Sequence, residues 1–149
     1  MIRETLKPMG KLNIVLRDKN GNVKDERQVD NLVVTTGKEW IAARMTDTAR
    51  PDDMSHMSIG SDNSAVTAGD TTLGTELGRV ALTGGEGVPA TNTIVYTATF
   101  PAGTGTGAVV EAGVFNGAAG GTMLCHTVFA VVNKGADDSV TITWTVTIA

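Results

Sequence analysis

The segment Ser139-Val-Thr-Ile-Thr-Trp-Thr-Val-Thr-Ile148 decides the fold class of this chain. Apolar side chains alternate with threonines along it, at positions Val140, Ile142, Trp144, Val146 and Ile148. A period of two residues is that of a β-strand with one buried face. We therefore expect a strand over residues 139–148 with its apolar face toward the core. The opposite threonine face is open to two interpretations, since it suits contact with solvent as well as hydrogen bonding to a neighbouring subunit.

The same residue types dominate the rest of the chain. Its 149 residues include 22 Thr, 17 Val and 7 Ile but only 8 Leu. Branching at Cβ restricts χ1 in a helix and packs well in a sheet, so this composition excludes a helical bundle. A chain of this length usually forms one domain with a sizeable core. Its single cysteine, Cys125, has no partner for an internal disulfide.

Charged residues are concentrated in the first third of the chain. Residues 1–53 carry 10 Lys or Arg and 9 Asp or Glu, whereas residues 54–149 carry 2 and 7. A polar but uncharged surface suits packing against another protein, because charges are depleted from interface centres; a solvated threonine face explains it equally well. The net charge of −4 gives no reason to expect nucleic-acid binding. The chain does not begin like a signal peptide, and no apolar run approaches a membrane span of about 18 residues.

Further strands are expected where runs of β-branched and aromatic residues lie between turn-forming segments. These runs are residues 11–18, 23–29, 54–60, 79–83, 93–100, 109–115 and 122–132. Their spacing is typical of an antiparallel sandwich or barrel. The predicted fold is therefore all-β, an antiparallel β-sandwich (jelly-roll-like) with an N-terminal hairpin and one short helix. Residues 10–149 are expected to form a single β-sandwich domain.

The hairpin and the helix each have a local signal. Asn20-Gly21 is a strong hairpin signal, because both residues tolerate positive φ. The returning strand is strongly charged, so we expect the hairpin at a sheet edge, where charges deter unwanted pairing. Thr36-Gly-Lys-Glu39 fits a capping box, with Thr36 as the N-cap and Glu39 reaching back to its amide. This pattern predicts a helix that runs to about Thr48.

Residues 1–9 are expected to form an extended N-terminal arm, because the proline of Lys7-Pro8 disfavours a helix there. Such an arm can gain order on contact with a partner. The candidate partner-contact residues are therefore Met1, Ile2, Arg3, Glu4, Thr5, Leu6, Lys7, Pro8 and Met9. The loops over residues 61–78 and 84–92 are the second candidates, since loops of that length are often functional.

No motif predicts catalysis, a metal site or a cofactor. Cys125 and His126 are neighbours in a predicted strand, so their side chains point to opposite faces and cannot form a dyad; Cys125 is interpreted as a core residue. Residues 61–70 lack the alternating acidic pattern of a calcium loop. The glycines at 103–107 have neither the Lys-Ser/Thr of a phosphate-binding loop nor a following helix. We therefore expect a protein that is not an enzyme and that binds neither nucleic acid nor membranes.

One polar residue is expected to be buried. Glu111 lies in an otherwise apolar strand, and a buried carboxylate needs a partner. Arg79 and Lys134 are the two cations after residue 53. We therefore predict a structural ion pair between Arg79 and Glu111. The alternative is a solvent-facing Glu111 on an edge strand.

Several segments resemble a family of small tailed-bacteriophage virion proteins. The resembling runs cover almost the whole chain, about residues 8–148, and include VDNLVVTTGK at 29–38, MSHMSIG at 54–60, AGDTTLGTE at 68–76, TFPAG at 99–103, EAGVFN at 111–116 and VVNKG at 131–135. The EAGVF motif also recurs in tail-fibre and collar-associated β-domains. The resemblance implies a non-enzymatic role in assembly and suggests no catalytic residues or cofactor.

Two positions in the virion are consistent with this resemblance. The first is a capsid decoration (cement) protein, which binds the outer capsid surface and stabilises the shell. The second is a tail-fibre, collar or baseplate-associated module. The expected partners are the major capsid protein or other virion proteins, with a homo-oligomer, preferably a trimer, in a virion assembled in the host bacterial cytoplasm. A carbohydrate-binding sandwich is a third class, with only Trp40, Trp144 and Tyr96 to stack on sugars.

Overall fold

The computed structural model describes residues 5–149, which form an antiparallel β-structure with one short helix. The strands are β1 (Pro8–Arg17), β2 (Val23–Val33), β3 (His56–Gly60), β4 (Glu76–Ala81), β5 (Val88–Ala90), β6 (Thr93–Phe100), β7 (Gly107–Phe115), β8 (Met123–Lys134) and β9 (Ser139–Ile148); the helix is α1 (Thr35–Arg44). Their order in the sheet is β4-β3-β7-β8-β2-β1-β9-β6-β5. The all-β prediction with a single short helix is confirmed.

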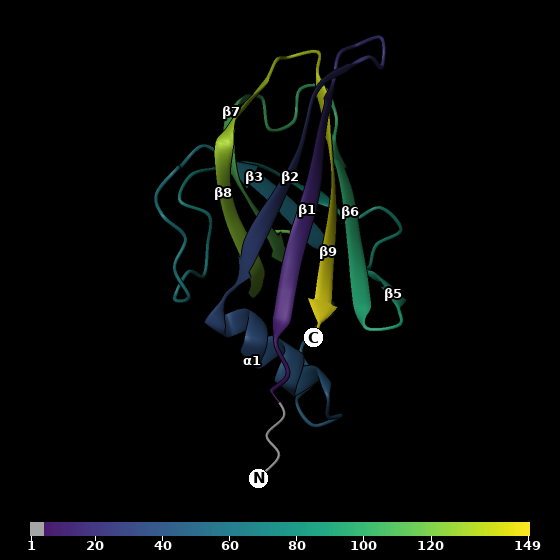
Figure 1. Cartoon of the computed structure of the whole chain (residues 1–149), viewed down its shortest axis with the longest axis vertical. Coiled ribbons are helices and arrows are strands. Elements are labelled where there is room, and N and C mark those ends of the chain that lie inside the picture. The colour runs from purple at the N-terminus through teal and green to yellow at the C-terminus, as the bar shows by residue number, and fades with distance from the viewer. Residues whose placement is uncertain (1–4) are drawn as a thin grey trace.

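The sheet is strongly curled, so that its two halves face each other. β2 pairs with β1 over most of its length, but it pairs with β8 only at Leu32–His126 and Val33–Cys125. In Figure 1, β1, β9 and β6 run side by side in front, and β3 crosses behind them. The far ends also meet, because the Thr83 amide after β4 donates to the Thr97 carbonyl of β6, 2.7 Å away. The two layers of the expected sandwich therefore belong to one continuous sheet.

A bulge in β8 explains why β2 and β8 separate. Val132 of β8 pairs with Val109, and Val128 pairs with Glu111, so three residues of β8 face one residue of β7. Such a bulge bends a strand and increases its twist. Arg27 of β2 spans the resulting gap and donates from Nη2 to the Val131 carbonyl, 2.9 Å away. The pairing at the end of β2 with β8 nevertheless places the charged hairpin in the middle of the sheet order, not at an edge as predicted, although only β1 is hydrogen-bonded along most of β2.

The main core lies between the two halves of the sheet. The inner face of β9 is buried from Val140 to Val146, as its alternation predicts, and only Ile148 at its end is partly exposed; Trp144 has no exposed surface. The inner side chains of β9 belong to the same core cluster as those of the facing half of the sheet, among them Met57, Ile59 and Val114. The Trp144 indole donates to Asn31 Oδ1, 3.1 Å away, so its one polar atom is paired. Small aliphatic side chains and these few aromatics form the core, as the composition predicts.

Strand positions follow the sequence pattern closely. The predicted strands at 93–100 and 139–148 coincide with β6 and β9, and the others shift by a few residues at their ends. β5 was expected to lie within a loop. It is three residues long, exposed and contains Pro89, which a strand tolerates at an edge because proline cannot donate to the ladder.

The helix does not begin with the predicted capping box. Val34 is the N-cap, and no side chain caps the helix. The Thr36 hydroxyl instead donates to the Met123 carbonyl of β8, 3.0 Å away, and Glu39 is exposed. A Cβ on Gly37 would collide with the backbone of Leu124, so this glycine lets the helix lie directly against β8. Docking on β8 therefore replaces the local cap, and the helix ends at Arg44, before Thr48.

The N-terminal arm is shorter than predicted. β1 begins at Pro8, so Pro8 and Met9 pair with Ile148 and Thr147 of β9. Lys7 and Ala149 extend this pairing with two backbone hydrogen bonds of 2.7 and 3.0 Å. Thr5 and Leu6 are exposed, and the candidate contact residues Met1–Glu4 lie outside the described residues.

Candidate functional site

The segment over residues 61–75, called here the covering loop, lies over the outer face of β3, β7 and β8. Its Leu73 packs with Val34, Phe115 and Met123 in a small core separate from the main one. The Ser61 amide donates to the Thr75 carbonyl, 2.9 Å away, and closes the base of the loop. Sequence alone predicted a loop here, but not that it buries a second apolar cluster.

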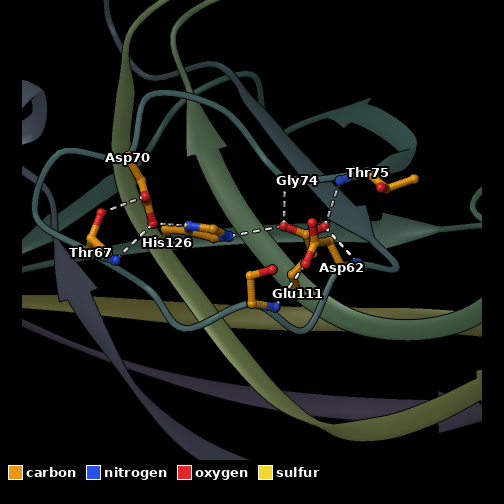
Figure 2. A network of polar contacts seen from close by, with 8 residues as sticks. Asp62, Thr67, Asp70, Gly74, Thr75, Glu111 and His126 are labelled. Carbon is orange, nitrogen blue, oxygen red and sulfur yellow. Dashed lines mark hydrogen bonds and ion pairs between the residues drawn. The ribbon is translucent and has the colours of Figure 1, made fainter.

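The covering loop is attached to the sheet by the carboxylate of Glu111. This side chain projects from β7 and is buried. Its Oε1 accepts the Gly74 amide at 2.8 Å, and its Oε2 accepts the amides of Asp62 and Thr75, both at 2.9 Å (Figure 2). Both ends of the loop are therefore bound to one buried group. Hydrogen bonds to the charged form offset the desolvation of a carboxylate.

His126 of β8 extends this cluster to a second carboxylate. Its Nε2 lies 3.0 Å from Glu111 Oε1, and its Nδ1 lies 2.8 Å from Asp70 Oδ2 (Figure 2). Asp70 also accepts from the amide and the hydroxyl of Thr67, at 3.0 and 2.7 Å. Burial disfavours the charge on Asp70, but the hydrogen bonds from Thr67 and His126 outweigh it and hold the pKa of that carboxyl below its usual value. Together, Asp70, His126 and Glu111 form what we call the clasp.

The predicted ion pair between Arg79 and Glu111 is not formed. β3 lies between β4 and β7, and in register Arg79 aligns with Ser58 and Gly113, whereas Glu111 aligns with Gly60. Arg79 instead bonds Glu76 at 2.8 Å and the carbonyls of Gly117 and Gly120, and its guanidinium lies 3.9 Å from the centre of the Phe115 ring. The alternative of a solvent-facing Glu111 is also wrong. The expectation that a buried Glu111 needs partners holds, with backbone amides and His126 in that role.

Cys125 and His126 point to opposite faces of β8, as predicted. Cys125 is buried in the main core, and burial raises the pKa of its thiol, so the reactive thiolate is disfavoured. His56 Nδ1 lies 2.8 Å from Ser55 Oγ. Within residues 5–149, however, no carboxylate bonds the other nitrogen of His56, so the pair lacks the orienting group that activates a serine.

The polar groups of the clasp are occupied in holding the covering loop on β7 and β8. A recess of about 320 Å³ lies beside it, lined in part by Asp62, Asp70, Glu111 and His126. Both oxygens of Glu111 already have two hydrogen-bond partners each. In the part of the chain that the structure describes, no group of three His, Cys, Asp or Glu side chains is placed to hold a metal ion.

The three residues considered for sugar stacking are largely covered. Trp144 is in the core, and Tyr96 is 4% exposed. Trp40 and Tyr96 do line one recess of about 350 Å³, together with Arg44 and Glu86. Arg44 lies 5.7 Å from the centre of the Trp40 ring, and the Trp40 indole donates to the Asp52 carbonyl. The recess therefore offers little free aromatic surface.

The outer face of β6 and β9, called here the threonine face, is polar and carries no charge. Directly paired residues on it are Thr93 with Thr147, Val95 with Thr145, Thr97 with Thr143 and Thr99 with Thr141. All eight side chains are half-buried or exposed, and the hydroxyls of Thr99 and Thr141 lie 3.0 Å apart. Paired β-branched side chains make this a stiff surface.

The comparisons with known proteins identify no relative. No protein-family model matches the chain, and no curated protein or solved structure matches it. None of the helices formed by residues 5–149 has the length and apolar character to cross a membrane.

Proposed function

We propose that the protein is a non-enzymatic structural protein of a tailed-bacteriophage virion, and that it serves there as a capsid decoration (cement) protein. The threonine face carries this proposal. It is a regular surface two strands wide, without charged side chains of its own, opposite the main core, and such a surface suits packing against another protein. The resemblance of runs such as EAGVFN at 111–116 to phage virion proteins supports the same role.

Several buried or half-buried polar side chains hold loops of the protein in place, and this supports a structural role. Glu111, His126 and Asp70 hold the covering loop. Lys134 is buried and donates to the carbonyls of Pro101 and Asp138, at 2.9 and 2.7 Å, so it fastens two loops. Groups saturated by such contacts are poor candidates for binding or transforming a substrate.

The proposed partner is the major capsid protein, bound through the threonine face, with the N-terminal arm as a second contact. A decoration protein stabilises a shell by burying additional interface across capsomer joints. The weak contacts of many copies add up to a large total stabilisation of the shell. Closed symmetry favours a trimer at three-fold positions. The protein would then be found in virions assembled in the bacterial cytoplasm.

The copy number in purified virions tests this proposal. We expect roughly hundreds of copies per particle by quantitative mass spectrometry, and density on the outer shell by cryo-electron microscopy. About six copies or fewer would overturn the decoration role and favour the tail-fibre, collar or baseplate alternative, which the EAGVF motif suggests. Absence of the protein from virions would overturn both.

A further inference from the structure

We propose that Asn20, at the tip of the hairpin between β1 and β2, is a site of spontaneous deamidation in the folded protein. The fold protects the other Asn-Gly pair of the chain, Asn116-Gly117, from the same modification. Water is the co-reactant, and the product at position 20 is an aspartate or an isoaspartate. This inference concerns the chain itself and is independent of the proposed virion role.

The reaction requires an asparagine side chain and the backbone nitrogen that follows it. That nitrogen attacks the side-chain carbonyl carbon, and the new C–N bond closes a succinimide ring. The proton of the backbone nitrogen passes through water to the side-chain NH₂ group, which leaves as ammonia. Water then opens the ring at either carbonyl, so one water is consumed for each ammonia released. Glycine in the following position favours the attack, because it has no side chain to cover the nitrogen.

The Asn20-Gly21 pair is free to react. Both residues are exposed, and the hairpin tip lies at the end of the molecule opposite α1 (Figure 1). Within residues 5–149, no hydrogen bond holds the Asn20 side chain. A Cβ on Gly21 would have no neighbour within 4 Å, so its surroundings are open. The Gly21 amide donates to the Asp18 carbonyl, 3.0 Å away, and this exposed bond is what has to open before the attack.

The Asn116-Gly117 pair is held in place. The Asn116 Oδ1 accepts the Thr122 amide at 2.7 Å, and its Nδ2 donates to the Asp52 carbonyl at 3.4 Å. The Gly117 carbonyl accepts from Arg79 Nη1, 2.9 Å away. Closing a succinimide ring displaces the whole side-chain amide, so both of its hydrogen bonds have to break first. The same dipeptide therefore reacts at one place in this fold and is protected at the other.

Deamidation changes the hairpin tip in two ways. It adds a negative charge two residues from Asp18, whose Oδ1 accepts the amides of Asn20 and Asn22 at 2.9 and 3.0 Å. The isoaspartate product also lengthens the backbone by one carbon, so the two amides no longer fit the same oxygen. The change stays local, because the ladder between β1 and β2 begins beyond the tip, where Arg17 pairs with Val23.

Mass spectrometry of the full chain tests this inference. The protein is incubated folded and, in parallel, unfolded in guanidinium chloride, and is then cleaved after its glutamates. This cleavage places the two Asn-Gly pairs in separate fragments, residues 5–26 and 112–149. In the folded protein, deamidation at Asn20 should be roughly tenfold faster or more than at Asn116, because the bonds of Asn116 have to break first.

The unfolded sample is the reference for the effect of the fold. In denaturant the two sites should react at similar rates, since each is the same dipeptide in an open chain. Equal rates at Asn20 and Asn116 in the folded protein would overturn the proposal. So would an Asn20 that reacts in denaturant but stays intact in the folded chain.

Asn22 is the control at the same hairpin tip. It is as exposed as Asn20, but the branched side chain of Val23 follows it and hinders the attack. Fragment ions should therefore place the modification on Asn20 and leave Asn22 intact. Equal modification of the two asparagines would show that exposure alone decides, and would contradict the role of the Asn-Gly pair.

Two variants complete the test. Asn20→Gln lengthens the side chain by one carbon, so it should suppress the reaction at the tip and leave the thermal midpoint unchanged. Asn20→Asp supplies the reference for the aspartate product, and the second product peak of the parent, which does not co-elute with it, is the isoaspartate. Undiminished deamidation of the 5–26 fragment in Asn20→Gln would overturn the assignment to Asn20.

Discussion

Gly60 and Glu111 lie directly opposite each other on β3 and β7, and the Glu111 side chain occupies the space that a side chain at Gly60 would need. A Cβ on Gly60 would lie 2.6 Å from Glu111 Oε2 and would also collide with the Thr75 carbonyl. The missing Cβ is therefore what allows a carboxylate to lie flat against the sheet and reach the amides of the covering loop.

Gly60→Ala should destabilise the protein by about 1–3 kcal/mol, because the added methyl group displaces Glu111 or the loop backbone. Urea unfolding of the two proteins measures the difference. Gly69→Ala is the matched control, since a Cβ there has no neighbour within 4 Å. Equal losses in the two variants would show that the fit between Gly60 and Glu111 is unimportant.

Glu111→Gln should cost about 3 kcal/mol or more, because the amide group places a donor where three backbone amides already converge. Thermal and urea unfolding both report this loss. Glu76→Gln removes an exposed carboxylate that contacts Arg79, and it should cost less than about 1 kcal/mol. A Glu111→Gln variant as stable as the parent would contradict the attachment role.

Protonation of Asp70 should make the protein less stable in acid. Its pKa is lower in the folded chain than its usual value of 3.8, so its contribution is present above that value and is lost as the pH falls through the lower folded value. Unfolding midpoints over an acid pH series should therefore decline less steeply in Asp70→Asn than in the parent. Identical acid profiles would contradict this assignment.

The threonine face can be tested with charge. Thr97 and Thr143 are paired on that face, and lysines at both positions point away from the main core. Thr97→Lys with Thr143→Lys should leave the melting temperature within a few degrees of the parent and reduce binding to purified particles at least tenfold. Thr48→Lys, at an exposed site after α1, should bind normally. Full binding by the double variant would exclude this face as the docking surface.

The contact proposed for the N-terminal arm can be tested by a deletion that is shorter than the predicted arm of residues 1–9. Removal of residues 1–6 retains the hydrogen bonds between Lys7 and Ala149 and leaves β1 intact. Particle occupancy should fall while stability is unchanged. Undiminished occupancy would show that the arm makes no contact with a partner.

Local patterns predicted most of the fold. β6 and β9 were located to the residue because β9 alternates without interruption and β6 alternates except at Val95, and a two-residue period is a property of the strand itself. The helix cap and the edge position of the hairpin were wrong for a shared reason. Both depend on contacts with β8, at Met123 for the helix and at His126 and Cys125 for β2, and neither contact is encoded in the local sequence.

The clasp was only half predictable. A buried Glu111 that needs partners followed from the apolar run around it, and a His126 on the face opposite Cys125 followed from strand alternation. The missing step was strand order. Gly113 pairs with His126, which places His126 diagonally next to Glu111 on the outer face, whereas β3 separates Glu111 from Arg79. The contribution of Asp70 comes from the path of a loop, for which the sequence has no periodic signal.

The pairing of Lys7 with Ala149 has a mechanical consequence. The two residues lie at the same end of neighbouring antiparallel strands, β1 and β9. A force that pulls them apart acts perpendicular to the two strands and breaks the hydrogen bonds between β1 and β9 one pair at a time. A force along the strands would load many bonds together. The molecule should therefore yield at low force when it is pulled at Lys7 and Ala149, and it should resist strongly when it is pulled along β9 between other anchor points.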